Sequence, residues 1–455
     1  MRRKVDAFLD NWYESRKTAL MIYGARQIGK SYSIEKFIKG KTDNYCLIDF
    51  SKRPDALEIF ESFKDKDDFY IKLSLFLEND NNKSIIFFDE IQELYIYREK
   101  KIMQNPTIYL NTVDLLTITK ALVQDDLHRY IFSGSMLGVT LNSVTLNPMG
   151  YIDLHKMFPM DFMEFLWANK IDDKIINYLK NCFDNVEKVD NGIHNKINRL
   201  FYEYILVGGM PDAVKSYINS RNFNDVSLIQ ESIINYYRAD ITKYANNDDK
   251  LIISEIYNNL ASEVNNINKR FIKTHLDINN IKNLDIIDKY LWLSNSGIAI
   301  PVYNVCNAKY PLKLSEERKT FKLFYGDVGL LSYELFGNIG RVKFLDGEIQ
   351  VNFGANFENV IAEELNSHNF KNLYYFNSKK QGEVDFIIEK NTDIIPIEIK
   401  SGKSNSNNKY NHNALDNILN NNKDIKLAYV LSPENTQKEE KIIYYPTYMI
   451  MFIEK

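Results

Sequence analysis

The stretch that decides the fold runs over residues 20–31 and reads Leu-Met-Ile-Tyr-Gly-Ala-Arg-Gln-Ile-Gly-Lys-Ser. Its apolar start predicts a short buried strand, which leads into a G-x-x-x-x-G-K-[ST] loop and then into a helical pattern over residues 32–39. This order of elements is typical of a site that binds the phosphates of a nucleoside triphosphate. Gly-Lys-Ser/Thr recurs at residues 40–42 and 402–404, but neither copy has a glycine five residues earlier.

Each residue type in the loop has a physical task. Gly24 and Gly29 let the backbone turn, so that several N–H groups point at phosphate oxygens, and the following helix adds partial positive charge. Lys30 adds a full positive charge near the β- and γ-phosphates, and Ser31 offers its hydroxyl to Mg²⁺. We therefore expect ATP to contact the whole loop, which comprises Gly24, Ala25, Arg26, Gln27, Ile28, Gly29, Lys30 and Ser31.

An apolar run at residues 84–90 ends in two carboxylates, Asp89 and Glu90. A strand that ends here would bring Asp89 to the carboxyl edge of a parallel sheet, beside the loop, where it is expected to hold Mg²⁺ through its water shell. Glu90 is the expected general base for the attacking water. After a further predicted strand, Ser133 and Ser135 are candidates to contact the γ-phosphate or this water, and a plain Ser-Gly-Ser turn is the alternative.

Composition sets limits on the class of protein. The chain has 455 residues, of which 45% are hydrophobic and 13% aromatic, so it can bury the cores of about three domains. Its net charge of −4 gives no overall basic signature for nucleic acid. The three cysteines have no disulfide or zinc spacing. No signal peptide and no run of about 18 apolar residues is present, so we predict a cytoplasmic protein without a membrane partner.

The pattern along the chain predicts four parts. Strands alternating with helices predict an α/β domain with a parallel sheet over residues 1–157, in which the polar residues 92–107 form a loop insertion. A helical lid is predicted over residues 158–245. Three helical stretches followed by an extended segment predict a winged helix-turn-helix over residues 246–345, with asparagine tracts at 265–268 and 279–280 as its turns. Residues 346–455 return to α/β.

The last part contains a second group of residues suited to chemistry. Residues 382–388 and 395–400 alternate polar and apolar side chains, which predicts two half-buried strands. Because alternate residues share a face, Glu398 and Lys400 lie on one side, where Asp385 of the neighbouring strand can meet them. Asp385 and Glu398 are the predicted Mg²⁺ ligands, and with Lys400 they can activate a water against a phosphodiester. A solvated hairpin with ordinary surface charges is the alternative.

The N-terminal motifs resemble the AAA-type P-loop ATPases of bacteria and archaea that are fused to a long, poorly characterised C-terminal region. The similarity rests on the phosphate loop, on Phe-Phe-Asp-Glu-Ile-Gln at residues 87–92 and on Ser-Gly-Ser at 133–135, and it extends over nearly the whole chain. It implies ATP and Mg²⁺ as cofactors, a sensor role for the serine turn, and assembly into a homo-oligomer.

One position departs from this family. The family usually has Gly-Arg where this chain has Gly150 and Tyr151. The arginine that senses the γ-phosphate is therefore left open, and Arg26, Arg129 and Arg238 are the candidates.

The C-terminal pattern resembles the core of PD-(D/E)xK nucleases, which have a restriction-endonuclease-like α/β fold. The resemblance implies metal and water roles for Asp385, Glu398 and Lys400, with Glu358 as an accessory carboxylate on the preceding helix. Two functional hypotheses follow. One is an Mg²⁺-dependent ATPase coupled to a nuclease-like, DNA-directed domain. The other is a nucleotide-dependent switch whose C-terminal domain binds nucleic acid or protein without cleavage, since a fold does not guarantee an activity.

Overall fold

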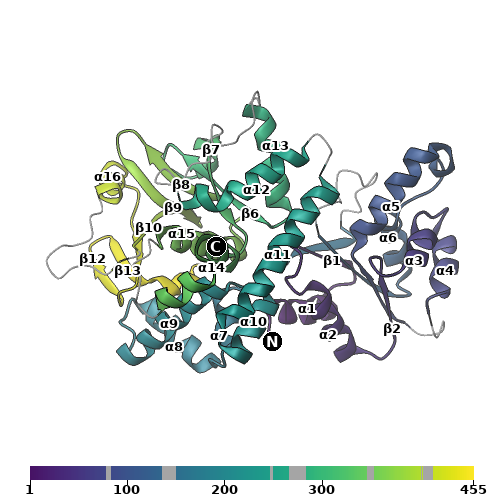
Figure 1. Cartoon of the computed structure of the whole chain (residues 1–455), viewed down its shortest axis with the longest axis horizontal. Coiled ribbons are helices and arrows are strands. Elements are labelled where there is room, and N and C mark those ends of the chain that lie inside the picture. The colour runs from purple at the N-terminus through teal and green to yellow at the C-terminus, as the bar shows by residue number, and fades with distance from the viewer. Residues whose placement is uncertain are drawn as a thin grey trace.

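The computed structural model describes residues 1–77, 83–135, 150–245, 249–265, 283–345, 353–400, 402 and 413–455. The N-terminal sheet lies at the right of Figure 1 and a second sheet lies at the left, with the long helix α11 (Phe223–Tyr244) between them. No helix within these described ranges is long and apolar enough to span a membrane.

The N-terminal sheet is parallel and five-stranded, with the order β2-β3-β4-β1-β5. Strand β1 therefore lies between β4 and β5, and its carboxyl end opens into the phosphate loop. All carboxyl ends of a parallel sheet meet at one edge, so the residues that follow β1, β3 and β4 come together there. The strands are β1 (Ala19–Tyr23), β2 (Tyr45–Asp49), β3 (Ile85–Asp89), β4 (Arg129–Gly134) and β5 (Ile152–Lys156).

Helices cover both faces of this sheet because its strands are apolar on both sides. Leu20 and Ile22 of β1 belong to the core shared with α1 (Lys4–Ser15) and α2 (Lys30–Lys41). Ala19 and Met21 point to the other face. The helices on that face are α3 (Pro54–Phe60), α4 (Lys66–Ser74), α5 (Ile91–Gln104) and α6 (Leu115–Asp125), and a short 3₁₀ turn (Pro106–Tyr109) follows α5.

The loop insertion predicted for residues 92–107 is wrong, because most of this stretch forms α5. Ile91, Leu94 and Tyr95 are buried at helical spacing against the sheet. The Tyr95 hydroxyl donates to Asp114 Oδ1 at 2.6 Å. The many polar residues of this segment lie on the solvent side of an amphipathic helix, and their number hid its narrow apolar stripe.

Residues 158–245, predicted to be a lid, are helical. Three of the helices begin at aspartate caps, since Asp161, Asp172 and Asp190 each accept a hydrogen bond from a backbone N–H of the first turn. Gly209 permits a very close chain crossing, because a Cβ there would lie 2.0 Å from the Met160 carbonyl oxygen. The helices are α7 (Phe162–Ala168), α8 (Asp173–Asn185), α9 (Asn191–Val207), α10 (Pro211–Ser220) and α11.

The second sheet is mixed and eight-stranded, with the order β12-β13-β11-β10-β9-β8-β6-β7. Helix α15 packs against it, and α12 and α13 contact its β6–β7 end. Its strands are β6 (Ala299–Val305), β7 (Glu316–Tyr325), β8 (Leu373–Ser378), β9 (Gly382–Lys390), β10 (Asp393–Ile399), β11 (Ala428–Ser432), β12 (Gln437–Glu439) and β13 (Ile442–Pro446). Its helices are α12 (Lys250–Asn265), α13 (Asn283–Asn295), α14 (Val328–Leu345), α15 (Gly354–Ser367) and α16 (Asn413–Asn421).

The winged helix-turn-helix predicted for 246–345 stays a prediction, because residues 266–282 within it lie outside the described residues. Strand β6, expected to be part of a wing, pairs in parallel with β8, so that Val302 lies beside Leu373. The predicted division at residue 345 thus separates strands that share one sheet. Residues 266–268 and 279–280, expected to be turns, lie outside the described residues. A strand's own pattern predicts its faces but not its partner, so the pairing of β6 with β8 could not be predicted from the sequence.

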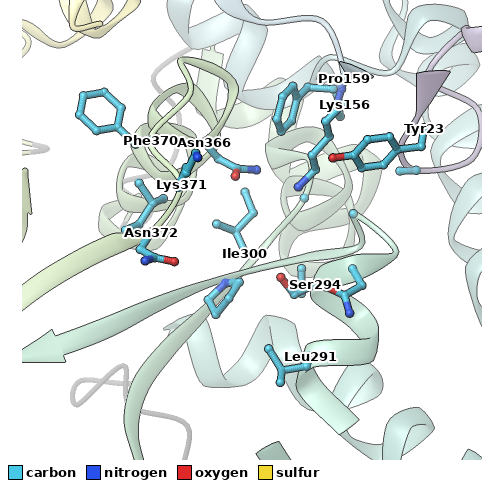
Figure 2. Close-up of a pocket in the computed structure, with 18 of the residues that line it drawn as sticks. Tyr23, Lys156, Pro159, Leu291, Ser294, Ile300, Asn366, Phe370, Lys371 and Asn372 are labelled. Carbon is cyan, nitrogen blue, oxygen red and sulfur yellow. The ribbon is translucent and has the colours of Figure 1, made fainter. Parts of the chain in front are cut away.

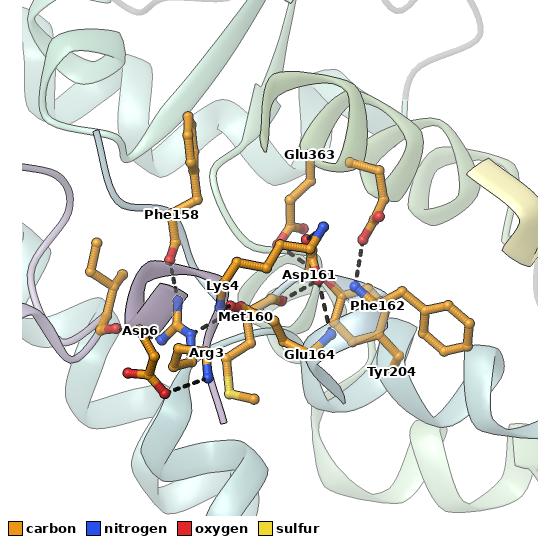
Figure 3. A network of polar contacts seen from close by, with 12 residues as sticks. Arg3, Lys4, Asp6, Phe158, Met160, Asp161, Phe162, Glu164, Tyr204 and Glu363 are labelled. Atoms are coloured by element: carbon orange, nitrogen blue, oxygen red, sulfur yellow. Dashed lines mark hydrogen bonds and ion pairs between the residues drawn. The ribbon is translucent and has the colours of Figure 1, made fainter. Parts of the chain in front are cut away.

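A buried polar network connects the N-terminal segment to the phosphate loop (Figure 3). The Arg3 guanidinium donates from Nε to Glu164 at 3.0 Å and from Nη2 to the Phe158 carbonyl at 2.8 Å. Its Nη1 donates to the carbonyl of Ile28, inside the loop, at 2.9 Å. One arginine therefore connects α1, the segment that leads into α7 and the phosphate loop.

The same network reaches the C-terminal sheet through α15. Glu364 accepts a hydrogen bond from the Phe162 N–H at 2.7 Å, and Lys4 pairs with Asp161 at 2.5 Å. Burial, with Asp161 nearby, raises the pKa of Glu364 to about 8, so this carboxyl keeps its proton at neutral pH. A neutral acid avoids the cost of burying one more charge where α7 meets α15.

Candidate functional site

The phosphate loop has the backbone that its glycines permit. Gly24 has φ +154°, and a Cβ there would lie 2.2 Å from the Met157 carbonyl oxygen. Gly29 has φ +86° and caps the N-terminus of α2. Gln27 also has a positive φ of 66°. These turns place the start of α2, with its unpaired N–H groups, directly after the loop, as a phosphate site requires.

Lys30 is buried inside this loop and is 5% exposed. Its ammonium donates to the carbonyl oxygens of Ala25 at 2.8 Å and Gly24 at 3.2 Å. Burial lowers the pKa of Lys30, and the nearby Glu90 and Asp89 carboxylates oppose this shift. The lysine is therefore held at the centre of the loop by weak neutral acceptors that phosphate oxygens can replace.

Asp89, at the end of β3, is the meeting point of three elements. It accepts a hydrogen bond from the Ser133 hydroxyl of β4, and the Ser31 hydroxyl of α2 is a second donor. Burial raises the pKa of Asp89, and the two hydroxyls oppose the rise. The structure thus brings Ser31, Asp89 and Ser133 together, and these oxygen donors are of the kind that Mg²⁺ takes beside a triphosphate.

Glu90 follows Asp89 in a left-handed backbone conformation, with φ 54° and ψ 47°. This conformation costs a residue with a side chain about 1–3 kcal/mol and turns the chain sharply into α5. Gln92 donates from Nε2 to the Glu90 carboxylate, and its Oε1 accepts the Ser135 N–H at 3.2 Å. Gln92 thereby fixes the side chain of Glu90 and the turn after β4 relative to each other.

The three candidate arginines lie in different places. Arg26 is in the loop, where Nη1 pairs with Asp240 of α11 at 3.0 Å and Nη2 donates to the Tyr244 hydroxyl at 2.9 Å. Burial raises the pKa of Asp240 to about 6, although Arg26 opposes the shift. Arg129 starts β4 at the opposite edge of the sheet and packs over Trp12. Arg238 pairs with Glu334 at 3.2 Å on the surface.

Arg26 is therefore the candidate that borders the phosphate loop, and it joins the loop to α11. The departure at position 151 has less consequence than the sequence suggests. Tyr151 stands just before β5, and its carbonyl accepts the N–H of Ala19 at the amino end of β1. An arginine there would start from the edge of the sheet that faces away from the loop, so this chain's own phosphate site does not lose a group.

The predicted C-terminal residues also come together. Asp385 on β9 accepts the Ile399 N–H at 2.8 Å, and Lys400 Nζ donates to Glu398 Oε1 at 2.9 Å. Burial raises the pKa of Glu398, Lys400 opposes the shift, and Glu358 on α15 adds to it. Glu358, Asp385, Glu398 and Lys400, with the two residues described next, form what we call the carboxylate cluster.

Lys322 on β7 and Glu383 on β9 complete this cluster, and neither was predicted from the sequence. Lys322 is 1% exposed, and its ammonium lies 2.8 Å from Glu383 Oε1 and 3.5 Å from Glu358 Oε2. Burial alone would lower the pKa of Lys322, but Glu358, Glu383 and Asp385 outweigh it and raise the pKa above its usual value. The lysine is therefore a fixed cation among the carboxylates.

The metal site predicted for Asp385 and Glu398 stays a prediction. Across the described parts of the chain, no group of three or more His, Cys, Asp and Glu side chains is placed to hold a metal ion. At the cluster, Lys322 already supplies a positive charge where carboxylates converge. Asp385 and Glu398 lie on neighbouring strands as expected, and the ligand role predicted for them awaits a direct measurement of metal binding.

Residues 16–166 match the family described as an AAA domain. The parallel sheet, with the phosphate loop on an internal strand, fits a P-loop NTPase, so the N-terminal part of the chain is similar to an AAA-type ATPase. Residues 198–338 and 353–449 match two families described as domains of unknown function, DUF8612 and DUF4143. No curated protein matches the chain.

Solved structures with some likeness are distant. A Walker-type ATPase of Pyrococcus abyssi is 14% identical, with a TM-score of 0.41, over 73% of this chain and 95% of that chain. The ORC2 protein of Aeropyrum pernix, in its ADP form, is 12% identical, with a TM-score of 0.25, over 75% and 91%. Likenesses of this size support no conclusion about the function of the chain.

Sequence reasoning missed residues that act through distant contacts. Arg3 reaches the loop at Ile28, and Lys322 reaches carboxylates on α15 and β9. Gln92 stands in the motif at residues 87–92 but carries no signal of its contact with Glu90. No spacing rule joins residues so far apart, since β7 and β9 are not even neighbouring strands.

Proposed function

We propose that the N-terminal domain binds and hydrolyses ATP with Mg²⁺. We further propose that this reaction switches the part of the chain built on the second, eight-stranded sheet, called the C-terminal module below, which binds nucleic acid without cutting it. The observation that carries the first part is the convergence of Ser31, Asp89 and Ser133 at the carboxyl edge of the sheet. Such a convergence from three elements at the mouth of a phosphate loop is what an NTPase site requires.

Each residue has a role in this proposal. The ammonium of Lys30 leaves the carbonyls of Gly24 and Ala25 for the β- and γ-phosphate oxygens, which are stronger acceptors. Ser31 and Asp89 would hold Mg²⁺, and the bound ion would supply positive charge to balance the phosphates. Glu90, oriented by Gln92, takes the proton of the attacking water. Ser133 senses the γ-phosphate through its bond to Asp89, and Ser135 continues this turn.

The coupling is proposed to run through Arg26. This loop residue is bound to Asp240 and Tyr244 at the end of α11, and the Tyr237 hydroxyl of the same helix donates to the Arg26 carbonyl at 3.3 Å. A loop that rearranges around phosphate oxygens would alter these bonds. Helix α11 lies between the two sheets in Figure 1, so a change there reaches the C-terminal module.

For the C-terminal module, cleavage and binding are the competing functions. The meeting of Glu358, Asp385, Glu398 and Lys400 resembles a nuclease centre, but Lys322 pairs with the accessory Glu358 and with Glu383. It therefore places a fixed positive charge beside the carboxylates predicted to bind Mg²⁺. We therefore favour binding without cleavage. Exposed Lys379 and Lys380, at the turn between β8 and β9, are suited to phosphate contacts and make DNA the expected partner class.

The test measures ATP hydrolysis, DNA binding and DNA cleavage on the same full-length preparation with Mg²⁺ and with Mn²⁺. We expect phosphate release and DNA retention with no strand breaks, and the same result for Asp385→Ala and Lys400→Ala. Cleavage that disappears in Asp385→Ala and Lys400→Ala would overturn the non-cleaving assignment. Absence of phosphate release would overturn the ATPase assignment, and absence of DNA retention would exclude DNA as the partner.

A further inference from the structure

A cavity of about 310 Å³ lies between the N-terminal domain and the C-terminal sheet, beside the phosphate loop, from which it takes Ala25. From one side, the ends of β1 and β5 contribute Tyr23 and Lys156. From the other side, β6, the end of α15 and the start of β8 contribute Ile300, Asn366 and Leu373, among others. In the sheet order β3-β4-β1-β5, strands β5 and β3 lie on opposite sides of β1, so the cavity lies across β1 from Asp89.

The charged side chains in the described lining of the cavity are all basic. The described residues that line it include Lys156 and Lys371 but no Asp or Glu. Lys156 is partly buried and contacts the Phe158 ring at 5.0 Å, and burial lowers its pKa with no carboxylate near enough to oppose the shift. Even partial burial of a cation without a counter-charge is unfavourable in a protein, and an anionic ligand would supply that counter-charge.

Hydrogen-bond donors surround this ammonium. Figure 2 shows the Lys156 ammonium, the Tyr23 hydroxyl and the Asn366 side-chain amide directed toward the middle of the cavity, above Ile300. Burial raises the pKa of Tyr23, so its hydroxyl remains a donor at physiological pH. An ammonium, a phenol and an amide that converge on one point form a recognition site for an oxyanion.

The geometry points to a binding site for one small molecule that carries a phosphate or carboxylate group, held by Lys156, Tyr23 and Asn366. The volume is at the lower end of the roughly 300–1,000 Å³ of small-molecule pockets, which suits a metabolite and is too small for a nucleic-acid strand. Tyr23 directly precedes Gly24, and Ala25 also lines the cavity. Such a ligand would therefore join the phosphate loop to the C-terminal module.

The test uses the full chain with Lys30→Ala, so that the phosphate loop does not compete for the probe. Inorganic phosphate and citrate are titrated separately by calorimetry, and the stronger binder identifies the preferred oxyanion. Loss of one charge-assisted hydrogen bond is expected to weaken binding roughly tenfold to a hundredfold in Lys156→Gln. Tyr23→Phe removes only the hydroxyl oxygen and keeps the side chain nearly the same size, so it should weaken binding less than Lys156→Gln does. Lys100→Gln, an exposed substitution on α5, is the matched control and should bind as the parent does.

Three results would overturn the proposal. The first is that neither probe binds the Lys30→Ala chain. The second is that Lys156→Gln and Tyr23→Phe both bind the probe as tightly as their parent. The third is that Lys156→Gln, made in the chain with Lys30 intact, loses ATP affinity to the same extent, which would make the cavity a part of the ATP site. The proposal expects unchanged ATP affinity in that variant.

Discussion

Replacement of Glu90 by glutamine is expected to leave ATP bound and to slow its hydrolysis by roughly 10²–10⁴-fold, the usual contribution of a positioned general base. The amide keeps the size of the side chain but cannot take the proton of the attacking water. The phosphate loop, Lys30 and Asp89 are untouched, so affinity should stay at the wild-type value. Phosphate release and titration with a fluorescent ATP analogue measure the two quantities separately.

Glu99→Gln on the exposed side of α5 is the matched control, because it makes the same chemical change on the same helix. It should hydrolyse ATP at the wild-type rate. If Glu90→Gln turned over ATP as fast as the control, Glu90 would not be the base. A parallel loss of affinity would instead assign Glu90 to binding, since removal of a group that acts in the transition state lowers kcat without changing ground-state binding.

Lys322→Met is expected to convert the carboxylate cluster into a divalent-cation site. Removal of a buried cation from its partners typically costs about 3–5 kcal/mol, because the carboxylates are left uncompensated. A bound Mn²⁺ would restore the missing charge. The variant should therefore unfold at a lower temperature than the wild type, and millimolar Mn²⁺ should raise its Tm while leaving the wild-type value unchanged. Both chains are compared without nucleotide, so that the ATP site contributes little.

Lys319→Met, three residues earlier on the same strand, is the control for this experiment because its side chain is exposed. It should behave as the wild type. The assignment of Lys322 as an internal cation would be wrong if Mn²⁺ stabilised the wild type and Lys322→Met equally. A DNA-cleavage assay on Lys322→Met with Mn²⁺ shows in addition whether the carboxylate cluster without Lys322 is enough for catalysis.

The N-terminal domain was the most predictable part of the molecule. Its phosphate loop is contiguous in sequence, and a strand that ends at Asp89 must deliver this residue to the edge where the loop stands. The parallel sheet was accordingly confirmed. Helix α5 was missed because Ile91, Leu94 and Tyr95 give a narrow apolar stripe among many polar residues. The catalytic roles of Glu90 and Ser133 stay predictions until activity is measured.

The C-terminal module was less predictable because its decisive contacts are long-range. Alternation placed Glu398 and Lys400 on one face of a strand, and this face does carry their ion pair. The alternation of side chains could not indicate that β7 joins the same sheet and places Lys322 beside Glu358. The pairing of β6 with β8 was not predicted for the same reason. Local pattern determines which face of a strand is buried, whereas the order of strands depends on the whole chain.

The central claim is that ATP binds at residues 24–31, and equilibrium titration of the full chain with Mg²⁺–ATP tests it most directly. Wild type, Lys30→Ala and the exposed control Lys39→Ala on the same helix are compared. Lys30→Ala should bind at least roughly a hundredfold more weakly, about 2.8 kcal/mol, because the buried ammonium that faces the phosphates is gone. Lys39→Ala should bind as the wild type does. Equal affinity of Lys30→Ala and wild type would contradict the claim.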